Sequence, residues 1–117
     1  MIFTSSGLHQ GEIQFEDIEF RQNFSGFKAY RQSKLGILLL TRWLAKNDKY
    51  LGVSFYCVHP GMVNTNLGRS AGWLSRNIFK LFGKSKEKGA QTHIYLINQD
   101  AKLLKSGEYY SNNKVTK

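Results

Sequence analysis

One stretch of about thirty residues constrains the fold of this chain more than any other. Across residues 29–47, large apolar residues recur at steps of three and four, which indicates an amphipathic helix with one buried face. The apolar positions that define this face are Leu35, Leu38, Leu39, Trp43 and Leu44. After Gly52, residues 53–58 are β-branched and aromatic, as in a buried strand, and Pro60 stops them because proline cannot donate to a sheet ladder. A helix that returns directly into a buried strand is typical of an α/β fold.

Weaker patterns flank this helix–strand unit. Residues 1–6 are expected to form a short buried strand, and residues 7–27 a long loop with a weak strand at 12–15. Beyond a loop to about residue 71, we expect helices at 73–82 and 86–99 and a closing strand at 107–111. Strands separated by helices pair in parallel through right-handed crossovers. Three such strands make only half of an open doubly wound sheet, so a larger parallel α/β domain is implied.

Composition excludes several classes of protein. The chain has 117 residues, which allows at most one ordinary domain, and its formal net charge is +9. A single cysteine cannot close an intrachain disulfide, and Cys and His are too few for a zinc finger, so no metal site is expected. The longest apolar run, residues 37–40, is far too short to cross a membrane, and the start does not resemble a signal peptide. We therefore expect a protein of the cytoplasm or of the cytoplasmic face of an intracellular membrane.

Basic residues gather between positions 69 and 88. Lys and Arg provide sequence-independent affinity for nucleic acids. No helix-turn-helix, zinc or RNA-recognition pattern accompanies them, so a solvated basic face is the simpler interpretation and no nucleic-acid partner is expected.

A tyrosine and a lysine one helical turn apart open the long helix. In the run Tyr30-Arg31-Gln32-Ser33-Lys34, the phenol and the ammonium project from the same face. Tyrosine, with an ordinary pKa of about 10, is a poor base at neutral pH, and a nearby cation favours the phenolate. The spacing is therefore suited to proton transfer, although a core tyrosine is the structural alternative.

Two further motifs follow predicted strands, where open α/β sheets place their ligands. Thr4-Ser5-Ser6 ends the first strand, and residues 60–65 (PGMVNT) follow the second. In this order, with the tyrosine–lysine pair, they resemble the short-chain dehydrogenase/reductase family. Four further segments narrow the resemblance to the retinol-dehydrogenase-like branch of this family: residues 28–35, 58–61, 88–92 and 106–111. The resemblance covers nearly the whole chain.

The resemblance implies a fold and an activity. Residues 1–117 would be the catalytic half of a Rossmann-type, doubly wound domain, its carboxyl-terminal part, without the glycine-rich amino-terminal half. The implied activity is NAD(P)-dependent interconversion of alcohol and carbonyl groups on a small lipophilic substrate such as a retinoid or steroid, with NADP(H) placed ahead of NAD(H). A homodimer is left open, because some members of the family dimerise.

The implied roles can be assigned to single residues. Tyr30 would be the acid/base, Lys34 would bind the nicotinamide ribose and favour the phenolate, and Ser6 rather than Ser5 would orient the substrate oxygen. The loop over the nicotinamide would contain Pro60, Gly61, Val63 and Thr65.

These 117 residues also depart from the family pattern. They contain no G-x-G-x-x-G turn and no Asn-Ala-Gly strand end. We therefore expect the isolated chain to bind dinucleotide poorly and to have little activity. The alternative function is that of a catalytically incomplete fragment acting only as a protein-interaction or membrane-surface module. Residues 73–84 combine an apolar face with basic residues at four-residue steps, which fits a lid, a membrane-surface helix or a helix packed on the core.

Structural alternatives apply to three other residues. Ser5 could cap a turn, His59 is expected to be structural rather than catalytic, and Cys57 is expected to be a small buried apolar residue.

Overall fold

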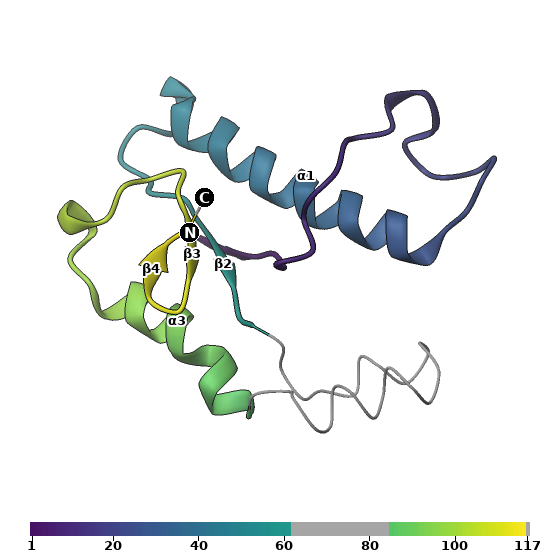
Figure 1. Ribbon diagram of the computed structural model, residues 1–117. Coiled ribbons are helices and arrows are strands. Elements are labelled where there is room, and N and C mark those ends of the chain that lie inside the picture. The colour runs from purple at the N-terminus through teal and green to yellow at the C-terminus, as the bar shows by residue number, and fades with distance from the viewer. Residues whose placement is uncertain (62–84, 117) are drawn as a thin grey trace.

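The computed structural model describes residues 1–61 and 85–116. Their strands form one sheet in the order β1-β2-β3-β4, with helices packed against it (Figure 1). The strands are β1 (Ile2–Thr4), β2 (Tyr56–His59), β3 (Tyr109–Ser111) and β4 (Lys114–Val115). β1 pairs with β2 and β2 with β3, both in parallel, so the predicted parallel α/β fold is confirmed.

β4 adds an antiparallel strand that the sequence patterns did not indicate. It pairs with β3 so that Ser111 lies opposite Lys114, which leaves a two-residue turn. Both turn residues, Asn112 and Asn113, have positive φ (51° and 62°). Asparagine tolerates this conformation, and such turns match the twist of a β-hairpin.

Two helices cover opposite faces of the sheet (Figure 1). They are α1 (Gly26–Lys46) and α3 (Lys86–Asn98), close to the predicted 29–47 and 86–99. Each begins after a serine whose hydroxyl accepts a hydrogen bond from the backbone N–H three residues on, Ser25 for α1 and Ser85 for α3. Single 3₁₀ turns lie at Phe15–Asp17, Asp48–Tyr50 and Ala101–Leu103.

The alternation of side chains along β2 creates two hydrophobic clusters. Cys57 points toward α1, where it packs with Leu38 and Tyr109. On the other face, Tyr56 and Val58 pack with a second group that also contains Leu96 and Tyr110. Cys57 and Val58 are fully buried, and burial raises the pKa of the Cys57 thiol. Cys57 is thus the buried, apolar residue that was expected.

Several sequence expectations were wrong in detail. β1 covers residues 2–4 instead of 1–6, and β3 begins at residue 109 instead of 107. Residues 12–15 form no strand; the segment bends over the start of α1, where the N–H of Gln14 donates to the side chain of Gln32. β2 begins at residue 56 instead of 53, because the chain before it bonds to the loop at Ser106 and Gly107 rather than to a strand. The apolar stripe of α1 is wider than its buried face, and Leu39 and Trp43 remain about half exposed. The helix expected at 73–82 lies outside the described residues.

The buried Tyr109 leads us to expect that the free energy of unfolding falls at alkaline pH. Its side chain is buried, and among the described residues its phenol oxygen has no hydrogen-bond partner. Burial, with a smaller contribution from the nearby Cys57 thiol, raises the pKa of Tyr109 to about 12. The unfolded phenol loses its proton near pH 10, whereas the folded phenol keeps its proton up to about pH 12. The contribution of this difference to the free energy of unfolding is therefore complete below pH 10 and is lost as the pH rises to about 12. Urea unfolding should show the free energy of unfolding falling across that range by at most about 3 kcal/mol.

Tyr109→Phe is the matched variant. Its free energy of unfolding should change less between pH 10 and 12 than that of the wild type. At neutral pH the variant should be as stable as the wild type or more stable by about 1 kcal/mol, since the substitution removes a buried hydroxyl without a partner. An identical alkaline decline in both proteins would show that Tyr109 is not its source.

Candidate active site

The end of β1 is fastened both to β2 and to α1. The backbone N–H of Ser5 donates to the carbonyl of Val58 at 2.8 Å, which continues the pairing of the two strands. The Ser5 hydroxyl donates to the carbonyl oxygen of Lys34, also at 2.8 Å. Ser5 is buried, and both of its donors are therefore used inside the fold. This side chain fixes the helix against the strand end and is poorly placed to bind a ligand.

Ser6 is also buried, but its hydroxyl has different hydrogen-bond partners. Its hydroxyl oxygen accepts the N–H of Leu8 at 3.2 Å, and its carbonyl accepts a hydrogen bond from the His9 ring at 2.7 Å. The bond from Leu8 leaves the hydroxyl proton of Ser6 available to donate. Of the two serines, Ser6 therefore has the hydroxyl better suited to orient a substrate oxygen.

Tyr30 and Lys34 lie on the same side of α1, as their spacing requires. The Lys34 ammonium nitrogen is 5.6 Å from the centre of the Tyr30 ring. The Tyr30 side chain is 44% exposed, so it is not a core tyrosine. Because Ser5 bonds to the backbone of Lys34 itself, the helix turn that carries the ammonium is tied directly to the strand end that carries Ser6.

The carboxyl end of β2 adjoins that of β1. His59 is the last residue of β2, and Pro60 and Gly61 follow it. The ring nitrogen Nδ1 of His59 accepts the backbone N–H of Gly7 at 3.1 Å and that of Gly61 at 3.3 Å. The loops after the two strands are therefore joined. Val63 and Thr65 lie outside the described residues.

His59 and Gly7 had no place in the expected site. The available signal was a histidine directly before Pro-Gly at the end of a predicted strand, together with a glycine directly after the two serines. Neither pattern alone indicates contact between the two loops.

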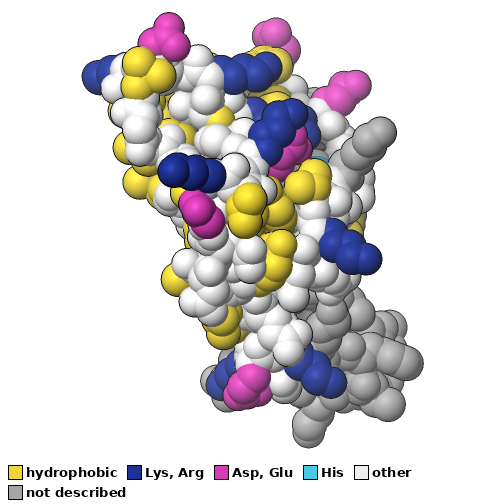
Figure 2. Space-filling view, turned by 90° about the vertical axis from the view of Figure 1, so that its left-hand side faces the viewer, with side chains coloured by type: hydrophobic (Ala, Val, Ile, Leu, Met, Phe, Trp, Pro, Cys, Tyr) yellow, Lys and Arg dark blue, Asp and Glu magenta, His cyan; other side chains and the backbone are white. Residues whose placement is uncertain are grey.

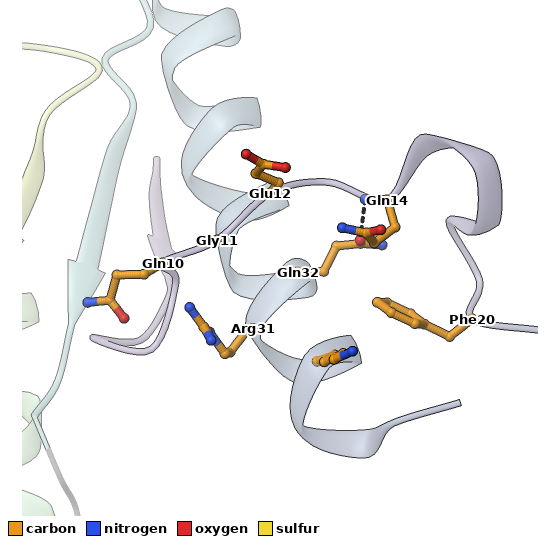
Figure 3. A pocket seen from close by; sticks show the side chains of 8 residues that line it. Gln10, Gly11, Glu12, Gln14, Phe20, Arg31 and Gln32 are labelled. Carbon is orange, nitrogen blue, oxygen red and sulfur yellow. Dashed lines mark hydrogen bonds between the residues drawn. The ribbon is translucent and has the colours of Figure 1, made fainter. Parts of the chain in front are cut away.

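A separate cavity of about 170 Å³ lies between residues 10–20 and the first turns of α1 (Figure 3). The Gln32 side chain, which lines this cavity, accepts the N–H of Gln14 and donates to the carbonyl of Ile18. Ser6, Tyr30 and Lys34 do not line it. It is a gap beneath a loop, distinct from the expected site.

Apolar side chains reach the surface between Lys and Arg side chains on the face shown in Figure 2. Within the parts of the chain that the structure describes, neither helix has the length and hydropathy of a membrane span.

No protein-family model matches this sequence. The chain is 37% identical to retinol dehydrogenase 12 of Homo sapiens over 115 residues, which cover 97% of this chain and 36% of that protein. It is 38% identical to retinol dehydrogenase 14 of Mus musculus over 121 residues, again 97% of this chain and 36% of the relative. A crystal structure of an uncharacterised protein from Mycobacterium paratuberculosis matches with a TM-score of 0.65 and 29% identity, covering 94% of this chain and 36% of its own. The chain thus spans about a third of the length of these relatives.

Proposed function

This chain is homologous to the retinol dehydrogenases, a branch of the short-chain dehydrogenase/reductase family, and from that homology we propose that it supplies the catalytic part of an NAD(P)-dependent oxidoreductase. The reaction is the interconversion of an alcohol and a carbonyl. The observation that supports this assignment best is the Lys34 ammonium 5.6 Å from the ring of a half-exposed Tyr30. The helix that carries both is tied through Ser5 to the segment after β1 that contains Ser6.

Each of the three side chains has a distinct part in the proposal. Tyr30 gives its proton to the carbonyl oxygen during reduction and removes a proton from the alcohol during oxidation. Lys34 places its ammonium 5.6 Å from the centre of the Tyr30 ring, where it can bind the nicotinamide ribose. Ser6 donates its hydroxyl proton to the substrate oxygen and so orients it.

A nicotinamide nucleotide, when bound, provides or accepts the hydride. The chemistry of the side chains fits the nicotinamide end of this molecule: Lys34 and Tyr30 offer accessible donors to ribose hydroxyls, while Pro60 and Gly61, with Val63 and Thr65, belong to the loop over the nicotinamide. The pyrophosphate end has no matching glycine-rich turn in the sequence. NADP(H) is proposed ahead of NAD(H), and an isolated 117-residue chain should bind either one weakly.

The substrate is proposed to be a lipophilic carbonyl or alcohol of the retinoid or steroid type, because the curated relatives are named retinol dehydrogenases. Residues 73–84 would form the lid over it or contact the cytoplasmic face of a membrane; they lie outside the described residues, and both roles stay predictions. Homodimer formation also remains a prediction.

A second candidate function is that of an interaction module. Among the described strands, β1 has a partner on one side only. Leu39, Leu40 and Trp43 on α1 are each about half exposed. An unpaired strand edge and an apolar helix face favour association with another polypeptide.

A chimera tests the first proposal. Residues 1–117 replace the matching third of human retinol dehydrogenase 12, and the purified chimera is assayed for reduction of all-trans-retinal with NADPH and with NADH. We expect turnover by the chimera and little by the isolated chain, for which calorimetric titration should show no micromolar affinity for either nucleotide. The reason is that only the chimera contains both the catalytic residues and a pyrophosphate site.

Circular dichroism and thermal unfolding show whether the chimera is folded. A folded chimera without retinal reductase activity would contradict the catalytic proposal and favour the interaction module. Micromolar binding of NADP(H) by the isolated chain would contradict the expectation that it lacks an essential part of the nucleotide site.

A further inference from the structure

The His59 ring joins the loop after β1 to the loop after β2, although Gly7 in the first loop lies 52 residues before His59. Its Nδ1 accepts from the backbone N–H of Gly7 and from the backbone N–H of Gly61. Both partners are donors, so Nδ1 carries no proton, and the neutral ring holds its proton on Nε2. Pro60 has no N–H, which makes Gly61 the first residue after β2 whose backbone can donate in this way.

The ring also packs against the backbone of Gly7. A Cβ at position 7 would lie 3.0 Å from Nε2 and 3.4 Å from the neighbouring carbons Cδ2 and Cε1 of His59. Such a distance is too short for an undisturbed contact, so a glycine at position 7 permits this approach. The ring is therefore located both by hydrogen bonds and by shape.

We propose that His59 is a positioning residue for the oxidoreductase site, and this rests on the function proposed above. It fixes the loop that follows Ser6 relative to the loop that begins with Pro60-Gly61. Ser6, directly before the first loop, is assigned to substrate orientation, and the second loop is assigned to contact with the nicotinamide. A change in their separation would therefore weaken nucleotide and substrate binding more than it would slow the proton transfer at Tyr30.

Two replacements separate the acceptor atom from the bulk of the ring. In His59→Asn, the side-chain oxygen Oδ1 can occupy nearly the place of Nδ1 and accept the same two N–H groups. In His59→Phe, the ring remains against Gly7 but has no acceptor. A positioning role through Nδ1 predicts that Asn preserves function and Phe does not, whereas a role in packing predicts the opposite order.

The first measurement is NMR spectroscopy of the wild-type 117-residue chain. Long-range ¹H–¹⁵N correlations of the His59 ring should show the tautomer protonated on Nε2. In His59→Phe, the Gly7 and Gly61 amides should exchange with solvent roughly tenfold faster than in His59→Asn, while the amide of Val58 in β2 should be unchanged. A His59 tautomer protonated on Nδ1, or equal exchange in the two variants, would overturn the proposal.

The second measurement uses the chimera described above. His59→Phe should raise the KM for nucleotide roughly tenfold with a much smaller change in kcat, and His59→Asn should restore the wild-type KM. Equal KM values in the two variants would overturn the positioning role. Absence of activity in the chimera with His59 intact would instead count against the proposed function, and the NMR result would still decide whether His59 joins the two loops.

Discussion

Tyr30→Phe in the chimera is expected to lower kcat/KM for all-trans-retinal by about 10²–10⁴-fold, the usual contribution of a positioned acid/base. The substitution removes only the hydroxyl, and the ring remains beside the Lys34 ammonium. Since the side chain is 44% exposed, the free energy of unfolding should change by less than about 0.5 kcal/mol. Steady-state kinetics and urea unfolding of the same preparation measure the two effects separately.

Tyr50→Phe is the matched control. Tyr50 lies in the 3₁₀ turn after α1, and its ring meets that of Phe55 edge-on, with centroids 6.0 Å apart. It should retain wild-type kinetics. If the Tyr30 variant kept half or more of the wild-type kcat/KM, Tyr30 would not be the acid/base.

Leu96→Ala should lower the free energy of unfolding by about 3 kcal/mol. Leu96 is only 4% exposed and is the buried residue through which α3 packs against Tyr56, Val58 and Tyr110. Its truncation removes apolar contacts and leaves a cavity between helix and sheet. Urea denaturation of the 117-residue chain measures the change.

Ile97→Ala is the neighbouring control. Ile97 is one position further along α3 and is 70% exposed, so its truncation should change stability by about 0.5 kcal/mol or less. Similar losses in the two variants would mean that α3 is not packed on the sheet as described.

The parallel sheet and its two covering helices could be predicted from sequence because each depends on local patterns. The helix before residue 47 has strong periodicity, and the run before Pro60 is β-branched and aromatic. Cys57 could be assigned to the core for the same reason. The apolar stripe on α1 is wider than its buried face, so Leu39 and Trp43 fit the helical period but remain about half exposed.

The candidate site was less accessible to sequence reasoning. The Tyr30–Lys34 spacing fixes the proximity of those two side chains, and the structure gives a half-exposed ring with the ammonium over it. The distinction between Ser5 and Ser6 depends on which hydroxyl the fold uses, and that is determined by the carbonyl of Lys34, 29 residues away. His59 could not be placed because the groups that donate to its Nδ1 are backbone amides, which carry no signature in the sequence.

The β3–β4 hairpin makes the two edges of the described sheet different. On its side, a short antiparallel strand with an exposed lysine covers the edge, which discourages further pairing. At β1, by contrast, the main-chain groups that face away from β2 have no neighbouring strand among the described residues. A further strand that paired with β1 would therefore place Ser6 and the turn of α1 that carries Lys34 beside the new junction instead of at a remote rim.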